Sequence, residues 1–407
     1  MKLPHTIRKE INPMLYPNCT ADLLGLKDVI VTKVENSSSQ IHVWLESVLQ
    51  MQVCPACRHE TKRTHSYRQQ SVKDLPLQGL NCILHLRRRR YFCPHCGAVF
   101  SEKLSFLARY QRNTSRLQAK VLHDYGCEYS TVSIAKRNGI SPGTAVRIFD
   151  RVSYPLPNLP RVLSIDEFKG NAGGRKFQCI LTDPVKHRIL DILPSKNSEA
   201  LIAYFLQFPL EKRKQVHHLV MDMSLQFREV MTSCFPNAGV ITDKFHVCRH
   251  VTWALENVRK SEQKKFSDER RKYFKKSRWL LLSRQEKLKP EQVQQLENML
   301  AVSEKLRKAY WLKENFYAFM DSRNIDEAKQ NLKNWNLCAG AVQLEEFQKC
   351  FEMINRWQPY ILRAFSLGYT NGFTEGCNNR IKVLKRNCYG VRNFSRFRNR
   401  ILHMMAS

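Results

Sequence analysis

Three acidic residues lie at positions where their carboxylates could bind metal ions. Asp166 follows the apolar run 162–165, Asp222 follows the apolar run 218–221, and Glu375 lies early in a helix-prone stretch. Short apolar runs are typical of buried strands, and neighbouring strand ends can bring distant residues together. Because Mg²⁺ prefers oxygen ligands, two or three carboxylates suffice to hold it. An isolated aspartate after a strand is more often a turn former, so this interpretation depends on the context of the three residues.

The charge of the chain indicates what such a site would act on. Lys and Arg number 67 against 36 Asp and Glu, which gives a net charge of +31 and a pI near 9.8. Each phosphate that a protein neutralises releases counterions, so this excess favours a nucleic acid partner. An anionic membrane would also attract the charge, but no apolar run approaches the ~18 residues needed to span a bilayer. Two metal ions about 3.5–4 Å apart can drive in-line displacement at a phosphodiester.

Four of the fourteen cysteines form two Cys-x-x-Cys pairs, Cys54 with Cys57 and Cys93 with Cys96. Two intervening residues let both thiolates reach one tetrahedral ion, and four thiolates leave no open position for catalysis. The spacing therefore predicts one structural Zn²⁺ in a reducing cytosol. Four free buried cysteines are the alternative, and four nearby histidines could serve as ligands although the cysteines suffice without them: His59, His65, His85 and His95.

Residues 58–92 separate the two pairs, which leaves room for extra strands such as 82–86. A basic stretch ends this segment and carries an aromatic residue, Tyr91, so it suits contact with phosphates. A solvated surface is the alternative reading. The candidate DNA-binding residues here are Arg87, Arg88, Arg89 and Arg90.

A helix-turn-helix is predicted by three short helical stretches, 117–125, 131–137 and 144–152. Gly139 supplies the tight turn, and Ser141 is the expected N-cap with Pro142 at the first helical position. In such a motif the last helix enters the major groove, which would expose Thr144 and Arg147 to the bases. A small three-helix domain without DNA function is the alternative.

The remaining elements indicate how the acidic residues are positioned. Strands are expected at 177–182, 189–193 and 239–242, with helices at 198–208 and 225–234, which together predict an α/β sheet. Residues 246–365 contain no strand-like pattern and read as helical.

Four motifs resemble the signatures of the ISL-three family of bacterial insertion-sequence transposases. They lie at 164–168, 220–224, 242–247 and 371–386, and the last is the most specific. The cysteine pairs and the helix-turn-helix precede them in the same order as in the family. The resemblance covers nearly the whole chain, apart from about the first 45 residues and the interior of the helical stretch.

The resemblance implies an RNase H-like catalytic domain with a DDE triad, interrupted by a helical insertion before the glutamate. By position the triad is Asp166, Asp222 and Glu375, holding two Mg²⁺ or Mn²⁺ ions. His246 lies in an Asp-x-x-His element of the family and could contact the scissile phosphate, or could be a structural histidine that caps a strand. The chain departs from the family pattern at 226–227 and at Cys377, and neither change removes a ligand.

The expected fold class is multi-domain α+β, with a zinc-ribbon-like module, a helix-turn-helix and the interrupted RNase H-like α/β domain. The expected domains are an N-terminal β-containing segment (1–49), the zinc-binding module (50–105), the helix-turn-helix (110–153), the first part of the catalytic domain (161–250), the helical insertion (251–365) and the second part of the catalytic domain (366–407).

The predicted function is DNA transposition in the bacterial cytoplasm, with no membrane partner. The protein would bind the terminal inverted repeats of an element, cut the end phosphate and join the 3′-hydroxyl to target DNA, as a homodimer or higher oligomer on double-stranded DNA. A nuclease of the same fold and a DNA-binding regulator without enzymatic activity are the alternatives. Further DNA contacts are expected from amide and basic side chains after Glu375: Asn378, Asn379, Arg380, Lys382, Lys385 and Arg386.

Overall fold

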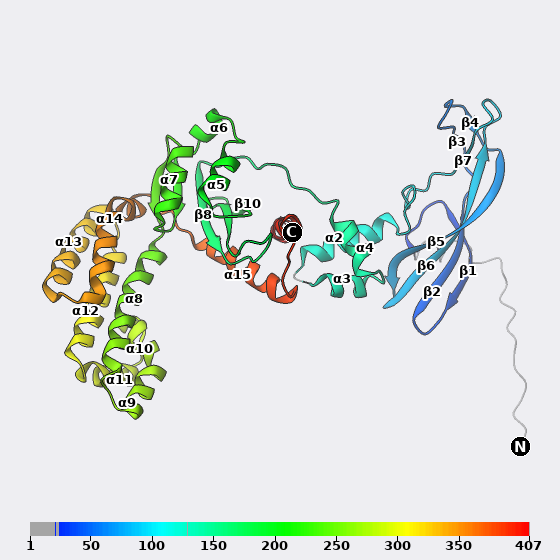
Figure 1. The fold of residues 1–407 in the computed structure, drawn as a ribbon. Helices are drawn as coiled ribbons and strands as arrows, with labels where there is room; N and C mark the ends of the chain where they lie inside the picture. Colours follow the sequence, from blue (N-terminus) through cyan, green and yellow to red (C-terminus); the bar gives the residue numbers. More distant parts are fainter. Residues whose placement is uncertain (1–20, 22–23, 128, 407) are drawn as a thin grey trace, which may run out of the picture. The chain divides into compact units, whose positions relative to one another are not determined.

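The computed structural model describes residues 21, 24–127 and 129–406, so the first twenty residues of the expected N-terminal segment lie outside the described ones. The chain forms two compact units (Figure 1). Unit 1 comprises Met1–Tyr154 with Arg386–Tyr389 and Ala406–Ser407, and unit 2 comprises Pro155–Lys385 with Gly390–Met405. Among the described helices, none combines the length and the apolar character needed to cross a bilayer.

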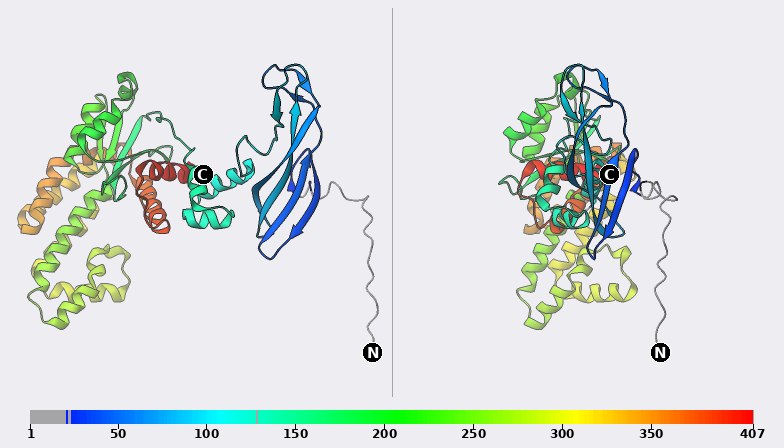
Figure 2. Two further views of the ribbon diagram at one scale, coloured as in Figure 1. Left: turned by 45° about the vertical axis from the view of Figure 1, so that its right-hand side comes forward. Right: turned by 90° about the vertical axis from the view of Figure 1, so that its right-hand side faces the viewer.

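Unit 1 contains a five-stranded sheet of mixed direction. The long hairpin of β5 and β6 (Figure 2) pairs through β6 with β2, in parallel, and β2 pairs with β1 in antiparallel fashion. One face of the sheet is apolar because alternate residues such as Val43, Leu84 and Leu86 are buried. The strands are β1 (Val29–Asn36), β2 (Gln40–Ser47), β5 (Thr64–Leu77), β6 (Leu80–Phe92) and β7 (Val99–Ser101), with a separate pair formed by β3 (Gln52–Val53) and β4 (Glu60–Thr61).

Three helices follow this sheet in the described part of unit 1: α2 (Ser115–Gly126), α3 (Thr131–Arg137) and α4 (Pro142–Phe149). The expected N-cap is confirmed, because the Ser141 side chain accepts a hydrogen bond from the Thr144 amide, and Pro142 opens α4. Gly139 has φ +62°, as the predicted turn requires. The last helix begins two residues earlier than expected and ends at Phe149 rather than at residue 152.

Unit 2 is built on a sheet with the strand order β10-β9-β8-β11-β12. The first three strands form an antiparallel meander, and β11 and β12 then add in parallel to β8. The strands are β8 (Val162–Phe168), β9 (Gln178–Asp183), β10 (Arg188–Leu193), β11 (His218–Met221) and β12 (Gly239–Thr242).

Side chains alternate along β8 and therefore face two different layers. Leu163 and Ile165 pack into a core with α5 (Ser198–Phe205) and α7 (Leu225–Cys234), while Val162 packs on the other face with Ala364 of α14. A short helix, α6 (Leu210–Lys214), precedes β11. Ser164 and Asp166 share the register of Val162, so their side chains lie on the α14 face.

Helices follow β12 without an intervening strand up to residue 406. A large apolar core joins most of them, including Leu255, Phe316 and Trp335. The boundaries expected at 250 and 365 fall inside α8 and α14. The helices are α8 (Lys244–Gln263), α9 (Asp268–Lys276), α10 (Arg278–Leu282), η1 (Gln285–Lys287), α11 (Pro290–Ala301), α12 (Glu304–Met320), α13 (Ile325–Val342), α14 (Glu345–Leu367), α15 (Gly372–Asn387) and α16 (Phe394–Ala406).

Candidate active site and DNA-binding modules

Three aspartates converge where the parallel strands of unit 2 end. β8 pairs with β11 only as far as Ser164, so Asp166 lies just beyond the paired region, and Asp222 directly follows β11. Asp243 follows β12, and its amide donates to the Met221 carbonyl at 3.0 Å. Asp166 lies within β8 rather than after it, because β8 continues to Phe168 through its pairing with β9.

Glu375 reaches the same edge from the first turn of α15. Buried polar contacts hold this turn against the sheet. Ser164 Oγ donates to the Asn371 side chain, the Asn371 amide lies 3.4 Å from Asp243 Oδ1, and Thr374 Oγ1 lies 2.7 Å from Thr182 Oγ1. A few hydrogen bonds therefore fix the glutamate beside residues that are about 200 positions earlier in the chain.

Asn378 lies one helical turn after Glu375 and faces the aspartates. It is 7% exposed, and its Nδ2 donates to Asp166 Oδ2 at 2.9 Å. Asn378 was predicted to contact a DNA phosphate, but its side chain donates to an aspartate instead. An amide donor suits this position because it fixes the carboxylate without the charge of a lysine or arginine.

The electrostatics of the site disfavour four adjacent negative charges. Burial, together with the nearby Asp222, Asp243 and Glu375, raises the pKa of Asp166 to about 7. Burial also raises the pKa of Asp222, of Asp243 and of Glu375. No lysine or arginine forms an ion pair with Asp166, Asp222 or Glu375 among the described residues. The cluster thus has the charge and the oxygen donors that a divalent cation would satisfy.

The tightest group of possible ligands in this cluster is Asp243, His246 and Glu375, whose ligand atoms all lie within 4.8 Å of one another. Asp243 Oδ2 and His246 Nε2 are buried without a hydrogen-bond partner among the described residues, and they lie 3.9 Å apart. Two buried polar atoms without partners fit a bound cation. Asp243 was not among the predicted metal ligands, although it follows a strand as Asp222 does.

The four predicted zinc cysteines form one cluster in unit 1. Cys54 Sγ lies 3.6 Å from Cys96 Sγ, and Cys57 Sγ lies 3.5 Å from Cys93 Sγ. Tetrahedral coordination at a Zn–S distance of about 2.3 Å places sulfurs roughly 3.8 Å apart, which fits these distances. A backbone hydrogen bond from Cys57 lowers the pKa of Cys54 to about 7, whereas burial and the neighbouring sulfurs raise the pKa of Cys57 to about 12, so without a cation the four thiols do not all ionise near neutral pH. The cluster supports a structural Zn²⁺.

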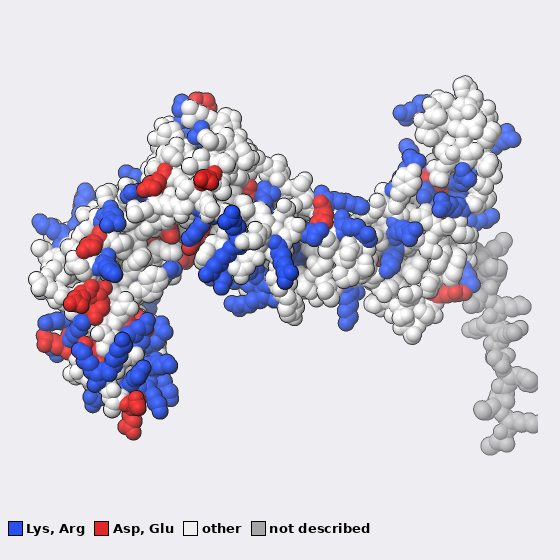
Figure 3. Space-filling model, in the orientation of Figure 1, with Lys and Arg blue, Asp and Glu red and all other residues white. Residues whose placement is uncertain are grey.

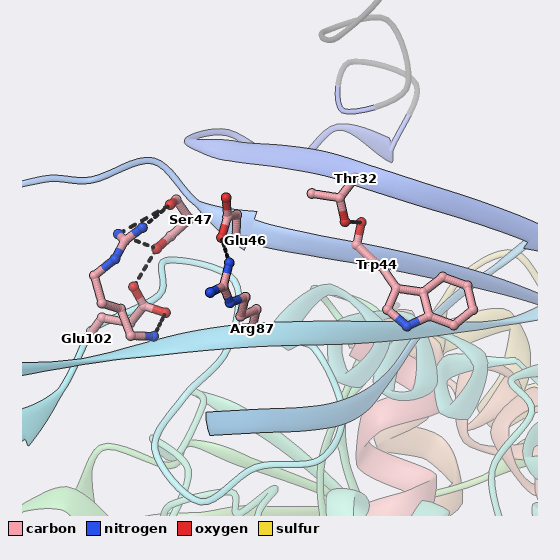
Figure 4. A network of polar contacts seen from close by, with 7 residues as sticks. Thr32, Trp44, Glu46, Ser47, Arg87 and Glu102 are labelled. Atoms are coloured by element: carbon pink, nitrogen blue, oxygen red, sulfur yellow. Dashed lines mark hydrogen bonds and ion pairs between the residues drawn. The ribbon is translucent and has the colours of Figure 1, made fainter. Parts of the chain in front are cut away.

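The four arginines of β6 differ in exposure. Arg87 is exposed and pairs with Glu46 at 3.4 Å (Figure 4). Its guanidinium lies 4.1 Å from the Tyr67 ring centroid. Arg89 lies on the same face of the strand as Arg87, but it is buried and its guanidinium donates to the Ser47 carbonyl. Arg88 and Arg90 are half-buried, so Arg87 is the most accessible of the four for a phosphate.

The helix-turn-helix packs against the β5–β6 hairpin. Asp74 of β5 is buried, accepts a hydrogen bond from Thr114 Oγ1 at 2.6 Å and pairs with Arg116 of α2. A Cβ on Gly139 would lie 2.1 Å from Asn81 Oδ1, so the turn touches the end of the hairpin. Arg147 lies in the last turn of α4, is exposed and donates to Thr144 Oγ1 at 3.1 Å.

The other basic and amide residues expected to contact DNA lie along α15. Asn379, Arg380, Lys382 and Arg386 are exposed. Lys385 is half-buried, and its ammonium donates to the Lys169 carbonyl.

Three family models match this chain. A family model described as "Transposase" matches residues 163–401. A zinc-finger model of the transposases IS204/IS1001/IS1096/IS1165 matches residues 50–96, and the helix-turn-helix domain of transposase family ISL3 matches residues 102–153.

Two relatives extend the likeness. The transposase for insertion sequence element IS1001 of Bordetella parapertussis is 26% identical over 367 residues, which cover 88% of this chain and 90% of the relative. The transposase for insertion sequence element IS1557 of Mycobacterium tuberculosis is 24% identical over 261 residues, which cover 58% of this chain and 57% of the relative.

Proposed function

The chain belongs to the ISL3 family of insertion-sequence transposases, and we propose that it cuts and joins DNA as a DDE-type enzyme. The observation that carries the proposal is the convergence of Asp166, Asp222 and Glu375 at one edge of the sheet, where no lysine or arginine of the described residues forms an ion pair with them. These carboxylates would hold two Mg²⁺ or Mn²⁺ ions, with Asp243 and His246 as adjoining ligands. When bound, the ions activate the attacking oxygen and stabilise the charge on the leaving oxygen.

The sheet supports an RNase H-like assignment. Its order, an antiparallel meander of β10, β9 and β8 followed by the parallel strands β11 and β12, delivers two carboxylates from the adjacent strands β8 and β11. We take the helices between β12 and α15 as an insertion in this domain. The zinc module (50–105) and the helix-turn-helix (110–153) would be separate domains, with the catalytic domain beginning near 161.

The chain's own residues position the reactants. Asn378 orients Asp166, and the Ser164, Asn371 and Thr374 contacts fix the start of α15. The zinc module and the helix-turn-helix hold the terminal inverted repeats. Hydrolysis at the element end releases a 3′-hydroxyl, which then attacks a phosphodiester of the target DNA. Alignment and charge stabilisation supply the rate without a covalent enzyme intermediate. Because two ends are joined, we infer at least a dimer on DNA.

The test incubates purified protein with labelled element ends, a target plasmid and Mg²⁺ or Mn²⁺. The wild type should yield joined product, and Glu375→Gln should bind ends normally but neither cut nor join them, because the amide lacks the charge a metal needs. Glu352→Gln, which changes an exposed acid of α14, is the matched control and should act as the wild type. Cleavage without joining indicates a nuclease, and binding alone indicates a regulator. Joining by Glu375→Gln at the wild-type rate would remove this glutamate from the triad.

A further inference from the structure

One face of α8 is exposed and carries basic and aromatic side chains that take no part in the apolar core. Arg249, Trp253, Lys260 and Lys264 are exposed and follow each other at intervals of four, seven and four residues, which places them in one stripe along the helix. The opposite face is buried and includes Val251, Leu255 and Val258. Trp253 is 47% exposed, although a tryptophan on a packed helix is usually covered.

The stripe begins at the acidic cluster. His246 lies on the same face of α8, one turn before Arg249. Burial raises the pKa of Glu375, and the positive charge of Arg249 partly offsets this rise. The Arg249 guanidinium lies 4.4 Å from the Trp253 ring centroid. A cation stacked on an exposed aromatic ring is a common element of nucleic acid contacts.

The stripe continues into α9, a helix in which Phe274 is the one buried residue. Residues 264–278 contain eight basic side chains and two acidic ones, a net charge of +6. Lys272 and Lys276 lie on the side opposite Phe274, and Tyr273 is 42% exposed. Figure 3 shows Lys and Arg gathered at one end of the helices α8–α14, around α9 and α10.

Most of these charges have no ion-pair partner within the described part of the chain. Lys265 pairs with Glu262 and Arg278 with Glu256. No carboxylate lies within ion-pair distance, among the described residues, of Lys260, Lys264, Arg270, Arg271, Lys272, Lys275 or Lys276. Among the neighbouring helices, α13 balances two bases with two acids, α14 balances three with three, and α12 has four bases against two acids. The excess of positive charge is therefore largest at the ends of α8 and α9.

We propose that this surface, the α8–α9 basic track, binds the sugar-phosphate backbone of the duplex DNA that adjoins the reacting phosphate. The inference rests on the proposed function, because it takes the acidic cluster as the cutting site. α8 has 20 residues and is about 30 Å long, which corresponds to roughly 9 base pairs of B-DNA. The contact is to phosphates, so it is independent of base sequence. The track consists of Arg249, Trp253, Lys260, Lys264, Lys272 and Lys276.

The test compares two variants of the full chain that lose the same four positive charges. The track variant carries Lys260→Ala, Lys264→Ala, Lys272→Ala and Lys276→Ala. The control carries Lys329→Ala, Lys333→Ala, Lys349→Ala and Arg356→Ala, which are exposed on α13 and α14. Binding to a random-sequence duplex is measured by fluorescence anisotropy over a range of salt concentrations. Hydroxyl-radical footprints on an element end with flanking DNA give the protected positions.

The track variant should bind random duplex about tenfold or more weakly at low salt. Its plot of log affinity against log salt should be shallower by about 3–4, or roughly 0.9 for each lost phosphate contact. It should also lose protection of roughly 10 base pairs beside the cleavage position. The control should keep the wild-type slope and footprint.

Two results would overturn the proposal. An equal loss in both variants would show that only net charge matters, and an unchanged slope and footprint in the track variant would exclude DNA from this surface. Both outcomes leave the proposed function standing, since cutting is measured separately. The proposed function itself fails if the wild-type protein binds no DNA.

Discussion

Replacing Asp166 with Asn should stabilise the metal-free protein at pH 8. Asp166 is 5% exposed, and burial with the nearby carboxylates raises its pKa from 3.8 to about 7. Between these two pKa values the folded state binds more protons than the unfolded state. The contribution of Asp166 to the free energy of unfolding is therefore fully present below about pH 4 and is lost as the pH rises through about 7.

The size of the effect follows from this shift. About three pKa units at roughly 1.4 kcal/mol each give an upper bound of about 4 kcal/mol at pH 8. Asparagine keeps the shape of the side chain, and its oxygen can accept the hydrogen bond from the Glu167 amide. Its Nδ2 can donate to Asn378 Oδ1 once the Asn378 amide turns over, since that oxygen has no other partner among the described residues, so most of this free energy should be recovered. In a domain of this size each kcal/mol moves Tm by about 2–4 °C, which predicts a rise of roughly 5–15 °C.

Thermal unfolding with a chelator at pH 5 and at pH 8 measures the effect, and Mg²⁺ titration at pH 8 completes the assay. The difference between variant and wild type at pH 5 should be roughly a third of that at pH 8, because at pH 5 Asp166 is protonated in the folded state but already largely ionised in the unfolded state. Mg²⁺ should raise the Tm of the wild type far more than that of the variant, because the variant lacks a ligand charge.

Asp191→Asn is the matched control, since Asp191 is also buried but has a cationic partner. It lies 3.0 Å from Arg398 Nη2 and 2.8 Å from Tyr204 Oη. Neutralising it should lower stability by about 3–5 kcal/mol, because the change breaks a buried ion pair. The reasoning is refuted if Asp166→Asn lowers Tm at pH 8, or if it raises Tm equally at pH 5 and pH 8.

Three further predictions concern unit 1. Cys93→Ser should reduce the zinc content from one per chain to nearly none by elemental analysis and weaken end binding, whereas Cys338→Ser should leave both unchanged. Arg147→Ala should weaken binding to element ends by about 1–3 kcal/mol in competition assays, and an equal loss on random DNA would make Arg147 a phosphate contact instead. Gly139→Ala should lower the Tm of unit 1 because its Cβ would meet Asn81 Oδ1 at 2.1 Å in a left-handed backbone conformation. The double variant with Asn81→Ala should recover part of that loss, and no recovery would place the strain in the backbone alone.

The sequence predicted those elements that local patterns specify. Apolar runs identified the strands β8 and β11, and a capping serine with a turn glycine identified the helix-turn-helix. The edge where Asp166 and Asp222 meet followed from parallel strands ending together. Asp243 was left out of the predicted ligands because the resemblance assigns only three carboxylates, and the sequence does not show that β12 ends beside β11.

Long-range geometry was beyond sequence reasoning. The parallel pairing of β2 with β6 joins segments about 40 positions apart, and nothing in either strand's periodicity specifies its partner. Asn378 was predicted to bind a phosphate because the sequence does not show that α15 lies beside Asp166, where the amide donates to the carboxylate. Arg89 looked accessible in a basic run, but its guanidinium is buried against the Ser47 carbonyl, a contact that nothing in the sequence of β6 indicates.

The hydrogen bond between Ser164 and Asn371 spans 207 positions, and this separation has a consequence for synthesis. A ribosome adds about 5–20 residues per second, so β8 emerges roughly 10–40 seconds before α15. The zinc module and the helix-turn-helix are complete before either, and domains fold as they emerge. We therefore expect a growing chain to bind DNA before Glu375 has been synthesised. We expect a chain interrupted between the helix-turn-helix and residue 371 to occupy element ends without cutting them, and so to compete with intact copies for the same ends.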